Sequence, residues 1–308
     1  MERLIYHVDV NSAYLSWEAT EQLRHGAETD IRKIPAIIGG DTAKRKGVVL
    51  AKSIPAKKYG IRTGEPVTDA LKKCPGLKSF SPDFALYKKY SHAFIQILEK
   101  YAPVVEQVSI DEAYLDMSGL HYFYENETDA ARLIQTEIRD TLGFTVNIGI
   151  SNCKVLAKMA SDFEKPDRIH TLFPDEIEEK MWPLPVRELF FTGAAAAAKL
   201  NSLGIQTIGD LAKSDVAFLK SHLKSQGEVL WRYANGLDDS PVRQEREQAK
   251  GYGNSTTLSK DVAEYEEAAK ILRKLSETVA RRLRKDGIYA QTIDVEIKDC
   301  QFFCCHSE

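Results

Sequence analysis

The chain of 308 residues begins with the run Leu4-Ile-Tyr-His-Val-Asp-Val10, and its middle carries Val108-Ser-Ile-Asp-Glu-Ala-Tyr-Leu-Asp116. The first run is apolar and β-branched with one acidic residue near its end, which predicts a buried strand. The second run predicts a hairpin with its tip at Asp111-Glu112. Two adjacent carboxylates in a regular strand point to opposite faces, so both reach one site only where the chain turns. We therefore expect Asp111 and Glu112 beside the end of the first strand, close to Asp9.

Three converging carboxylates repel one another unless cations neutralise them. Oxygen ligands of this kind suit Mg²⁺, with Mn²⁺ as the alternative. Two such ions about 3.5 to 4 Å apart support phosphoryl transfer. Taken alone, a single acidic residue in a strand is more often a cap or a member of an ion pair. The pattern by itself leaves polymerases, nucleotidyl cyclases and nucleases open.

The regions around these two runs predict an α+β domain with a ferredoxin-like sheet and an insertion after its first strand. The order is strand, helix, hairpin, helix, strand, and a further helix follows. The predicted elements are a helix through Trp17 and Leu23, strands at 35–40 and 47–51, short helices and turns at 55–76, a helix at 84–101, a hairpin at 104–118, a helix at 130–142, a strand at 144–150 and a helix at 154–163.

The second half of the chain has a different texture. Residues 167–237 are helical and rich in loops, and residues 238–250 are polar without a period, which predicts a linker. A strand at 252–258, a helix at 261–284 that stops at Gly287, and an alternating strand at 293–298 are expected beyond it. Two strands and one helix do not make an independently stable sheet, so we expect this last domain to be incomplete.

Composition places the chain among globular proteins, with 43% hydrophobic and 28% charged residues. Its length predicts about two to three domains. We expect a cytoplasmic protein, because no apolar run approaches the roughly 20 residues that span a bilayer and no signal peptide follows Met1. The five cysteines form neither a disulfide framework nor a zinc motif. Although the net charge is −3, basic residues cluster in three runs. These runs are Lys44-Arg45-Lys46, Lys57-Lys58 and Arg281-Arg282-Leu283-Arg284-Lys285.

Three motifs carry a resemblance to a known family. They are Tyr6-His-Val-Asp-Val-Asn-Ser-Ala-Tyr14, Ser109-Ile-Asp-Glu-Ala113, and Asn152-Cys-Lys-Val-Leu-Ala-Lys-Met-Ala-Ser-Asp162 followed by Lys165-Pro166. Together they resemble the motif series of Y-family translesion DNA polymerases, most closely the bacterial DinB/UmuC type. Order and spacing agree from residue 1 to about 300.

The resemblance implies a right-handed polymerase with a ferredoxin-like palm, small fingers, a helical thumb that carries a helix-hairpin-helix, and a partial little finger. It implies the following division: palm 1–12 and 81–168, fingers 13–80, thumb 169–237, linker 238–250 and partial little finger 251–308.

The resemblance also implies the chemistry. The enzyme would add dNMPs from dNTPs to a primer 3′-hydroxyl, with low fidelity and across damaged template. Asp9 and Asp111 would hold two Mg²⁺ ions, Glu112 would bind the catalytic ion, and the Val10 carbonyl would help with the nucleotide-bound ion. A catalytically silent DNA-binding or regulatory relative and a palm-type nucleotidyl cyclase are the competing interpretations.

The same resemblance assigns the substrate site. Tyr14 falls at the steric-gate position, where an aromatic ring clashes with a ribose 2′-hydroxyl, and Lys165 matches a lysine that neutralises the triphosphate. Asn11, Ser12 and Ala13 belong to the nucleotide site beside them. Lys57 stands where relatives often have arginine, and Ile54, in place of a tyrosine, is expected only to pack.

The DNA contacts are expected in the thumb and the little finger. Gly193 and Gly204 belong to the stretch that resembles the helix-hairpin-helix, which binds duplex phosphates through backbone amides. Five alanines at 194–198 replace the lysine, threonine and glutamate of relatives. Arg281 and Arg282 are the expected contacts in the little finger. The implied partners are primer-template DNA, dNTP and a sliding clamp, the last through a C-terminal peptide that relatives carry beyond this chain; we expect a monomer without membrane contact.

Overall fold

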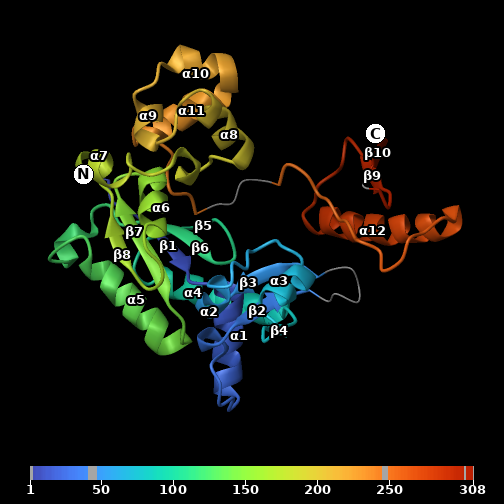
Figure 1. Cartoon of the computed structure of the whole chain (residues 1–308). Coiled ribbons are helices and arrows are strands. Elements are labelled where there is room, and N and C mark those ends of the chain that lie inside the picture. The colour runs from blue at the N-terminus through green and yellow to red at the C-terminus, as the bar shows by residue number, and fades with distance from the viewer. Residues whose placement is uncertain (1–2, 41–46, 245–248, 302, 308) are drawn as a thin grey trace.

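The computed structural model describes residues 3–40, 47–244, 249–301 and 303–307 (Figure 1). A five-stranded sheet with its helices forms the centre, a three-stranded sheet lies beside it, a helical cluster adjoins it, and a C-terminal unit lies apart. The predicted basic run Lys44-Arg45-Lys46 falls outside the described residues. Within the described ranges, no helix combines the length and the apolar character that crossing a membrane requires.

The central sheet has the strand order β5-β6-β1-β7-β8, and only β7 and β8 pair in parallel. Along the chain β1, α4, β5, β6, α5 and β7 follow one another around an insertion after β1. This chain order and sheet order are those of a ferredoxin-like fold, so that prediction is confirmed. The strands are β1 (Ile5–Val10), β5 (Val104–Gln107), β6 (Glu112–Asp116), β7 (Val146–Ser151) and β8 (Ile169–Thr171).

Strand β1 divides the two faces of this sheet. Because side chains alternate along a strand, Tyr6, Val8 and Val10 enter a core that they share with α1, α4 and α5. His7 and Asp9 project to the opposite face, which α6 covers. The helices are α1 (Ala13–Arg24), α4 (Phe84–Leu98), α5 (Asp129–Leu142) and α6 (Lys154–Asp162).

The insertion after β1 forms a small unit with its own core. Its sheet has the order β3-β2-β4, and the apolar residues between sheet and helices include Ile37, Val49, Ile61 and Val67. The elements are β2 (Ala36–Gly39), β3 (Val49–Lys52), α2 (Ile54–Lys57), α3 (Val67–Lys73) and β4 (Lys78–Phe80).

The helical cluster is built on the outer side of α6. Val155, Leu156 and Met159 of α6 enter the same core as Leu200, Leu211 and Leu230, so this cluster and the central sheet share one helix. The helices are α7 (Ile177–Lys180), α8 (Ala194–Ser202), α9 (Ile208–Ala212), α10 (Val216–Leu223) and α11 (Ser225–Ala234).

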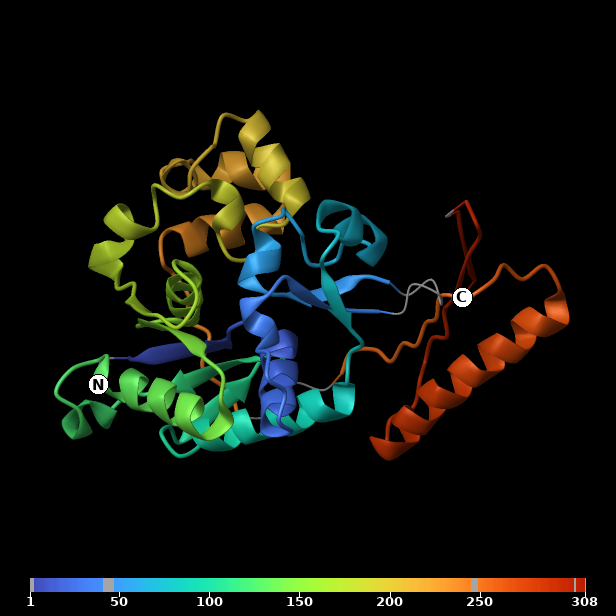
Figure 2. The ribbon, with the colours of Figure 1, turned by 60° about the horizontal axis from the view of Figure 1, so that its bottom comes forward.

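The C-terminal unit lies to one side of the rest of the molecule in both ribbon views (Figures 1 and 2). It consists of α12 (Tyr265–Lys285), β9 (Val295–Lys298) and β10 (Cys304–Ser307). The predicted strand at 252–258 is wrong, because these described residues pair with no other strand. The helix begins at Tyr265, four residues later than predicted, and ends before Gly287, whose φ of 68° suits a glycine. No residue of α12 is buried.

The predicted linker at 238–250 begins as a docked segment. Asp238 accepts a hydrogen bond from the Val155 amide at the start of α6 (3.1 Å), and Glu106 accepts one from the Arg243 amide (2.8 Å). Val242 is only 9% exposed, in a cluster with Ile5 and neighbouring side chains. The chain therefore stays on the central sheet as far as Arg243.

Candidate active site

Asp9 and Glu112 are direct partners in the β1–β6 pairing. Asp9 is 6% exposed, and both side chains project toward α6. The amide of the next residue, Val10, donates a hydrogen bond to the Asp111 carbonyl oxygen at 3.0 Å. The register of two strands therefore brings Asp9, Asp111 and Glu112 to one end of the sheet.

Asp111 is held by its own loop. The turn between β5 and β6 spans residues 108–111, so Glu112 is already the first residue of a strand. The predicted tip at Asp111-Glu112 is one to two residues too late. The Ser109 hydroxyl donates to the Asp111 carboxylate at 2.7 Å. Among the residues that the structure describes, no group of three His, Cys, Asp or Glu side chains is close enough together to hold a metal ion.

Two lysines compensate the charge of the carboxylates. Lys158 Nζ lies 2.9 Å from Glu112 Oε1, and Lys165 Nζ pairs with Asp9. Both ammonium groups also contact Asp162, at 3.4 Å from Lys158 and 2.8 Å from Lys165. A continuous chain of alternating charges thus runs from Asp9 to Glu112.

Burial and these cations act on Asp9 in opposite directions. Burial raises the pKa of Asp9 to about 7, although Lys165 and Lys158 lower it, while a hydrogen bond with Glu112 also raises it. An anionic Asp9 therefore needs positive charge close by. The donors at this end of the sheet are all oxygens, which fits a hard divalent cation.

His7 lies behind Glu112 and is 1% exposed. The Ser161 hydroxyl lies 2.8 Å from His7 Nδ1 and also 2.8 Å from the Lys158 carbonyl oxygen. On the other side of the ring, His7 Nε2 faces Glu112 Oε2 at 3.9 Å. Burial, with Lys158 and Lys165, holds the pKa of His7 well below its ordinary value, so the ring is neutral.

Tyr14 lies in an aromatic corner next to the carboxylates. Its ring stacks on Tyr87 with a centroid distance of 4.7 Å and an interplanar angle of 20°, and it meets the edges of Phe84 and Trp17. Burial and the charge of Asp111 raise the pKa of Tyr14. The effect of Asp111 indicates that the ring lies near the carboxylate end of the sheet.

The turn from β1 to α1 offers backbone amides to the candidate site. Ser12 has a φ of 49°, and the amides of the first helical turn after it, Ala13 included, have no partner within the helix. Asn11 is buried, and its side-chain oxygen accepts from Thr145 Oγ1 and the Asp167 amide, both at 2.9 Å, while its amide donates to Asn147. Asn11 therefore braces the loop that carries Lys165.

The insertion presents Lys57 and Ile54 on the short helix α2. Lys57 is exposed, and Ile54 is 52% exposed rather than packed as predicted. Burial and the neighbouring charge of Lys57 lower the pKa of Lys52. This edge of the small sheet is therefore electropositive.

The residues predicted to contact DNA lie in two separate units. Gly193 caps the start of α8, where Ala194 and Ala195 are exposed and two further alanines of the run are buried. Gly204 has a φ of 83° in the turn toward α9. In α12, Arg281 is exposed, whereas Arg282 donates to the Gly253 carbonyl and lies over the Tyr252 ring.

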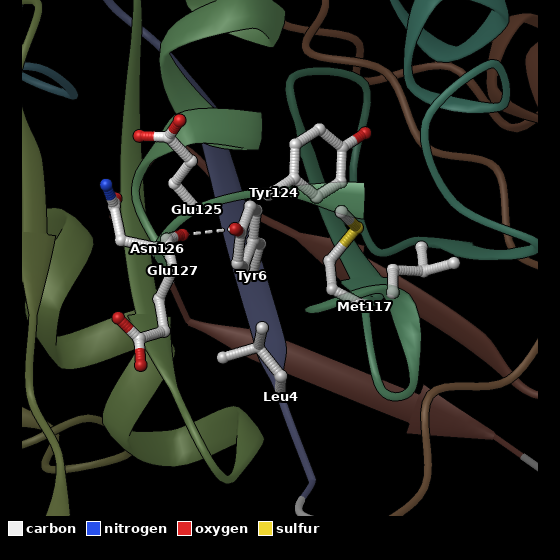
Figure 3. A pocket seen from close by; sticks show the side chains of 8 residues that line it. Leu4, Tyr6, Met117, Tyr124, Glu125, Asn126 and Glu127 are labelled. Atoms are coloured by element: carbon white, nitrogen blue, oxygen red, sulfur yellow. Dashed lines mark hydrogen bonds between the residues drawn. The ribbon is translucent and has the colours of Figure 1, made fainter. Parts of the chain in front are cut away.

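A pocket of about 230 Å³ opens elsewhere, between the start of β1 and the segment that precedes α5 (Figure 3). The Tyr6 hydroxyl crosses it to donate to the Glu127 carbonyl, and Leu4, Met117 and Tyr124 line it. Tyr6 is on the core face of β1, whereas Asp9 is on the other face. The pocket is therefore not part of the carboxylate site.

Sequence reasoning missed His7, Lys158 and Asp162 as parts of the site. A signal was present in the spacing of Lys154, Lys158 and Asp162, because residues four apart share one face of a helix. His7 alternates with Asp9 and so shares its face of the strand.

The chain is similar to proteins of one family over most of its length. The impB/mucB/samB family model matches residues 8–162, and the model of that family's C-terminal domain matches residues 249–303. A DNA polymerase IV of Clostridium acetobutylicum is 49% identical over 302 residues, which cover 98% of this chain and 76% of that protein. DNA polymerase IV 1 of Bacillus subtilis is 38% identical over 297 residues, 96% of this chain and 70% of that protein.

Solved structures show the same fold. A Y-family DNA polymerase chimera of Dbh and Dpo4 superimposes with a TM-score of 0.84 at 23% identity, over 99% of this chain and 86% of that one. A ternary complex of Dbh superimposes with a TM-score of 0.71 at 22% identity, over the same shares.

Proposed function

The chain belongs to the impB/mucB/samB family and is a translesion DNA polymerase, and from this premise we propose that Asp9, Asp111 and Glu112 form its catalytic centre. It acts on DNA and dNTPs and depends on divalent metal ions. The observation that carries the proposal is the register of β1 and β6, which pairs Asp9 with Glu112 while the Val10 amide bonds to Asp111.

Asp9 and Asp111 would hold two divalent ions, Glu112 would bind the catalytic one, and the Val10 carbonyl would contribute to the nucleotide-bound one. When bound, the ions would make the primer 3′-hydroxyl more acidic and would neutralise negative charge on the leaving pyrophosphate. Mg²⁺ is the proposed ion and Mn²⁺ a substitute, since all donors are oxygens. Asp111 has to turn its carboxylate from Ser109, whose hydroxyl holds it here.

The incoming dNTP lies between the turn after β1 and the insertion. The amides of the first turn of α1, at Ser12 and Ala13, bind phosphate oxygens. Lys165 leaves Asp9 and pairs with the triphosphate, and the exposed Lys57 adds positive charge. Asn11 holds the Lys165 loop in place, and Tyr14 rejects a ribose 2′-hydroxyl by a steric clash.

The units of the structure support a division into palm (1–12 and 81–168), fingers (13–80), thumb (169–237), linker (238–250) and partial little finger (251–308). The thumb binds duplex phosphates through amides near Gly193 and Gly204. Arg281 and Arg282 add contacts from the little finger. The enzyme works as a monomer in the cytoplasm and is recruited by a sliding clamp.

The two competing interpretations are not favoured. A nucleotidyl cyclase has no use for the unit that matches the family's C-terminal domain. A protein that only binds DNA would not need three carboxylates at one end of a sheet, where their charges repel one another.

Primer extension with a single dNTP tests the proposal on an undamaged and an abasic template, with and without Mg²⁺. Addition of one nucleotide to the primer on both templates, only when Mg²⁺ is present, is the expected result. DNA binding without extension would support the silent relative instead. A cyclic nucleotide formed without primer would support the cyclase.

A further inference from the structure

We propose that Tyr87 is a positioning residue for sugar selection, because its ring, stacked on Tyr14, fixes the ring that meets the sugar of the incoming nucleotide. The inference rests on the proposed role of Tyr14 as steric gate. It adds a second residue, 73 positions further along the chain, without which that gate does not hold its place.

Three aromatic side chains contact the ring of Tyr14. Tyr87 covers a ring face at 4.7 Å and 20°, and Phe84 meets the ring at 6.2 Å and 84°. Trp17 adds an edge contact at 6.0 Å. Tyr14 itself is half-buried, so part of its ring stays accessible. The stacked Tyr87 ring therefore limits how far the Tyr14 ring can move toward it.

A steric gate works only if its ring does not yield. A ribonucleotide differs from a deoxyribonucleotide by one oxygen atom, and a displacement of about 1 Å changes the fit of a reacting substrate substantially. Tyr14 lies in the first turn of α1, and its own χ angles offer other staggered positions. The resistance comes from close packing behind the ring.

Tyr87 is suited to give that resistance. It is 0% exposed, and its ring also contacts Trp17 and Phe84, at 5.9 Å each. Its helix α4 has a firm start, because the Asp83 side chain accepts hydrogen bonds from the Ala85 and Leu86 amides at 3.0 Å. Tyr87 therefore cannot retreat when Tyr14 is pushed toward it.

The test compares the kcat/KM for rCTP with that for dCTP in variants of the full chain. Tyr87→Leu should raise the rCTP to dCTP ratio about tenfold, the factor that corresponds to the loss of one stacked aromatic pair. The kcat/KM for dCTP should stay within about twofold. Tyr87→Phe keeps the ring and should leave the ratio unchanged. If the role of Tyr87 were purely structural, its loss would lower the kcat/KM for rCTP and for dCTP alike. The rCTP to dCTP ratio would then stay at the wild-type value.

Tyr90 provides a matched control on the same helix. It is 2% exposed, and its hydroxyl bonds to Glu21 and Arg24, but its ring contacts Phe144 and not Tyr14. Tyr90→Leu should lower the melting temperature as Tyr87→Leu does, with an unchanged rCTP to dCTP ratio. An equal rise of the ratio in both variants would overturn the inference.

Two further variants keep the inference testable. Tyr14→Ala separates it from the proposed function: if Tyr14→Ala leaves sugar selection unchanged, the gate itself is wrong. If Tyr14→Ala relaxes selection and Tyr87→Leu does not, only the role of Tyr87 is wrong. Should Tyr87→Leu fail to fold, Tyr87→Met and Phe84→Ala take its place, since Phe84 is 54% exposed. An unchanged ratio in both would overturn the inference.

Discussion

Gly149 of β7 lies so close to Ala157 of α6 that a Cβ atom on Gly149 would lie 2.0 Å from the Ala157 carbonyl oxygen. The same Cβ atom would lie 2.4 Å from the Ser161 amide nitrogen. Both neighbours are backbone, so neither can rotate aside. The distance between α6 and the sheet, and with it the reach of Lys158 to Glu112, therefore depends on the missing side chain.

Gly149→Ala should consequently destabilise the protein by about 3 kcal/mol or more, because the helix has to move off the sheet. Chemical denaturation measures the loss. Gly76→Ala is the control, since nothing lies within 4 Å of a Cβ there and the change should cost less than about 1 kcal/mol. Equal stability of the two variants would contradict the close approach.

Asp111→Ala should lower the rate of primer extension at least about 1,000-fold, because an oxygen donor of the catalytic centre is lost. DNA affinity, measured by fluorescence anisotropy, should stay within about twofold. Asp140→Ala removes an exposed carboxylate on α5 and should extend at the wild-type rate. Normal extension by Asp111→Ala in Mg²⁺ would refute the proposed site.

Lys158→Met and Lys154→Met form a matched pair one helical turn apart on α6. Lys158 is 12% exposed and 2.9 Å from Glu112, and Lys154 is 15% exposed and 2.7 Å from Glu106. Lys158→Met should lower extension at saturating Mg²⁺ about 10- to 100-fold, as the loss of a partner that orients a metal ligand does. Lys154→Met should extend normally. Thermal unfolding of both variants separates this effect from stability, and equal rates would argue against an orienting role.

Lysine in place of Ala194 and Ala195 should strengthen the thumb's grip on DNA. Both residues are exposed at the start of α8, which is the proposed site of phosphate contact. The slope of log affinity against log salt should steepen by about one for each new contact. Ala27→Lys, beyond the end of α1, adds one such charge away from the thumb and should leave the slope unchanged. If the wild type, the protein with lysine at 194 and 195, and Ala27→Lys all gave the same slope, that result would contradict phosphate contact at α8.

The palm was predictable because its elements carry clear periods. The helix predicted through Trp17 and Leu23 is α1, and the strands and helices of the ferredoxin-like fold occupy their predicted places within a few residues. The strand predicted at 252–258 failed because a strand-like composition shows only that a segment suits a sheet, and no partner strand lies beside it.

The sequence predicted that the carboxylates, Tyr14 and Lys165 belong to one site, but it did not predict Lys158. The pairing of Lys158 with Glu112 joins residues 46 positions apart and depends on the height of α6 above the sheet, which no local pattern encodes. Asn11 was expected at the nucleotide, yet its polar atoms bond to Thr145, Asn147 and Asp167, which lie far along the chain.

The chain that leads to the C-terminal unit leaves the palm after Arg243, because Asp238, Val242 and Arg243 are docked there. The connection starts at Arg243 rather than at the end of the thumb. Tyr252 and Gly253 already contact Asp286 and Arg282 of the C-terminal unit, so the stretch between Arg243 and Tyr252 spans at most roughly 30 Å when fully extended. The helical cluster shares the core of α6 with the central sheet, whereas the C-terminal unit is connected to that sheet through this stretch. A shift of the C-terminal unit along a DNA duplex therefore does not require the helical cluster to move.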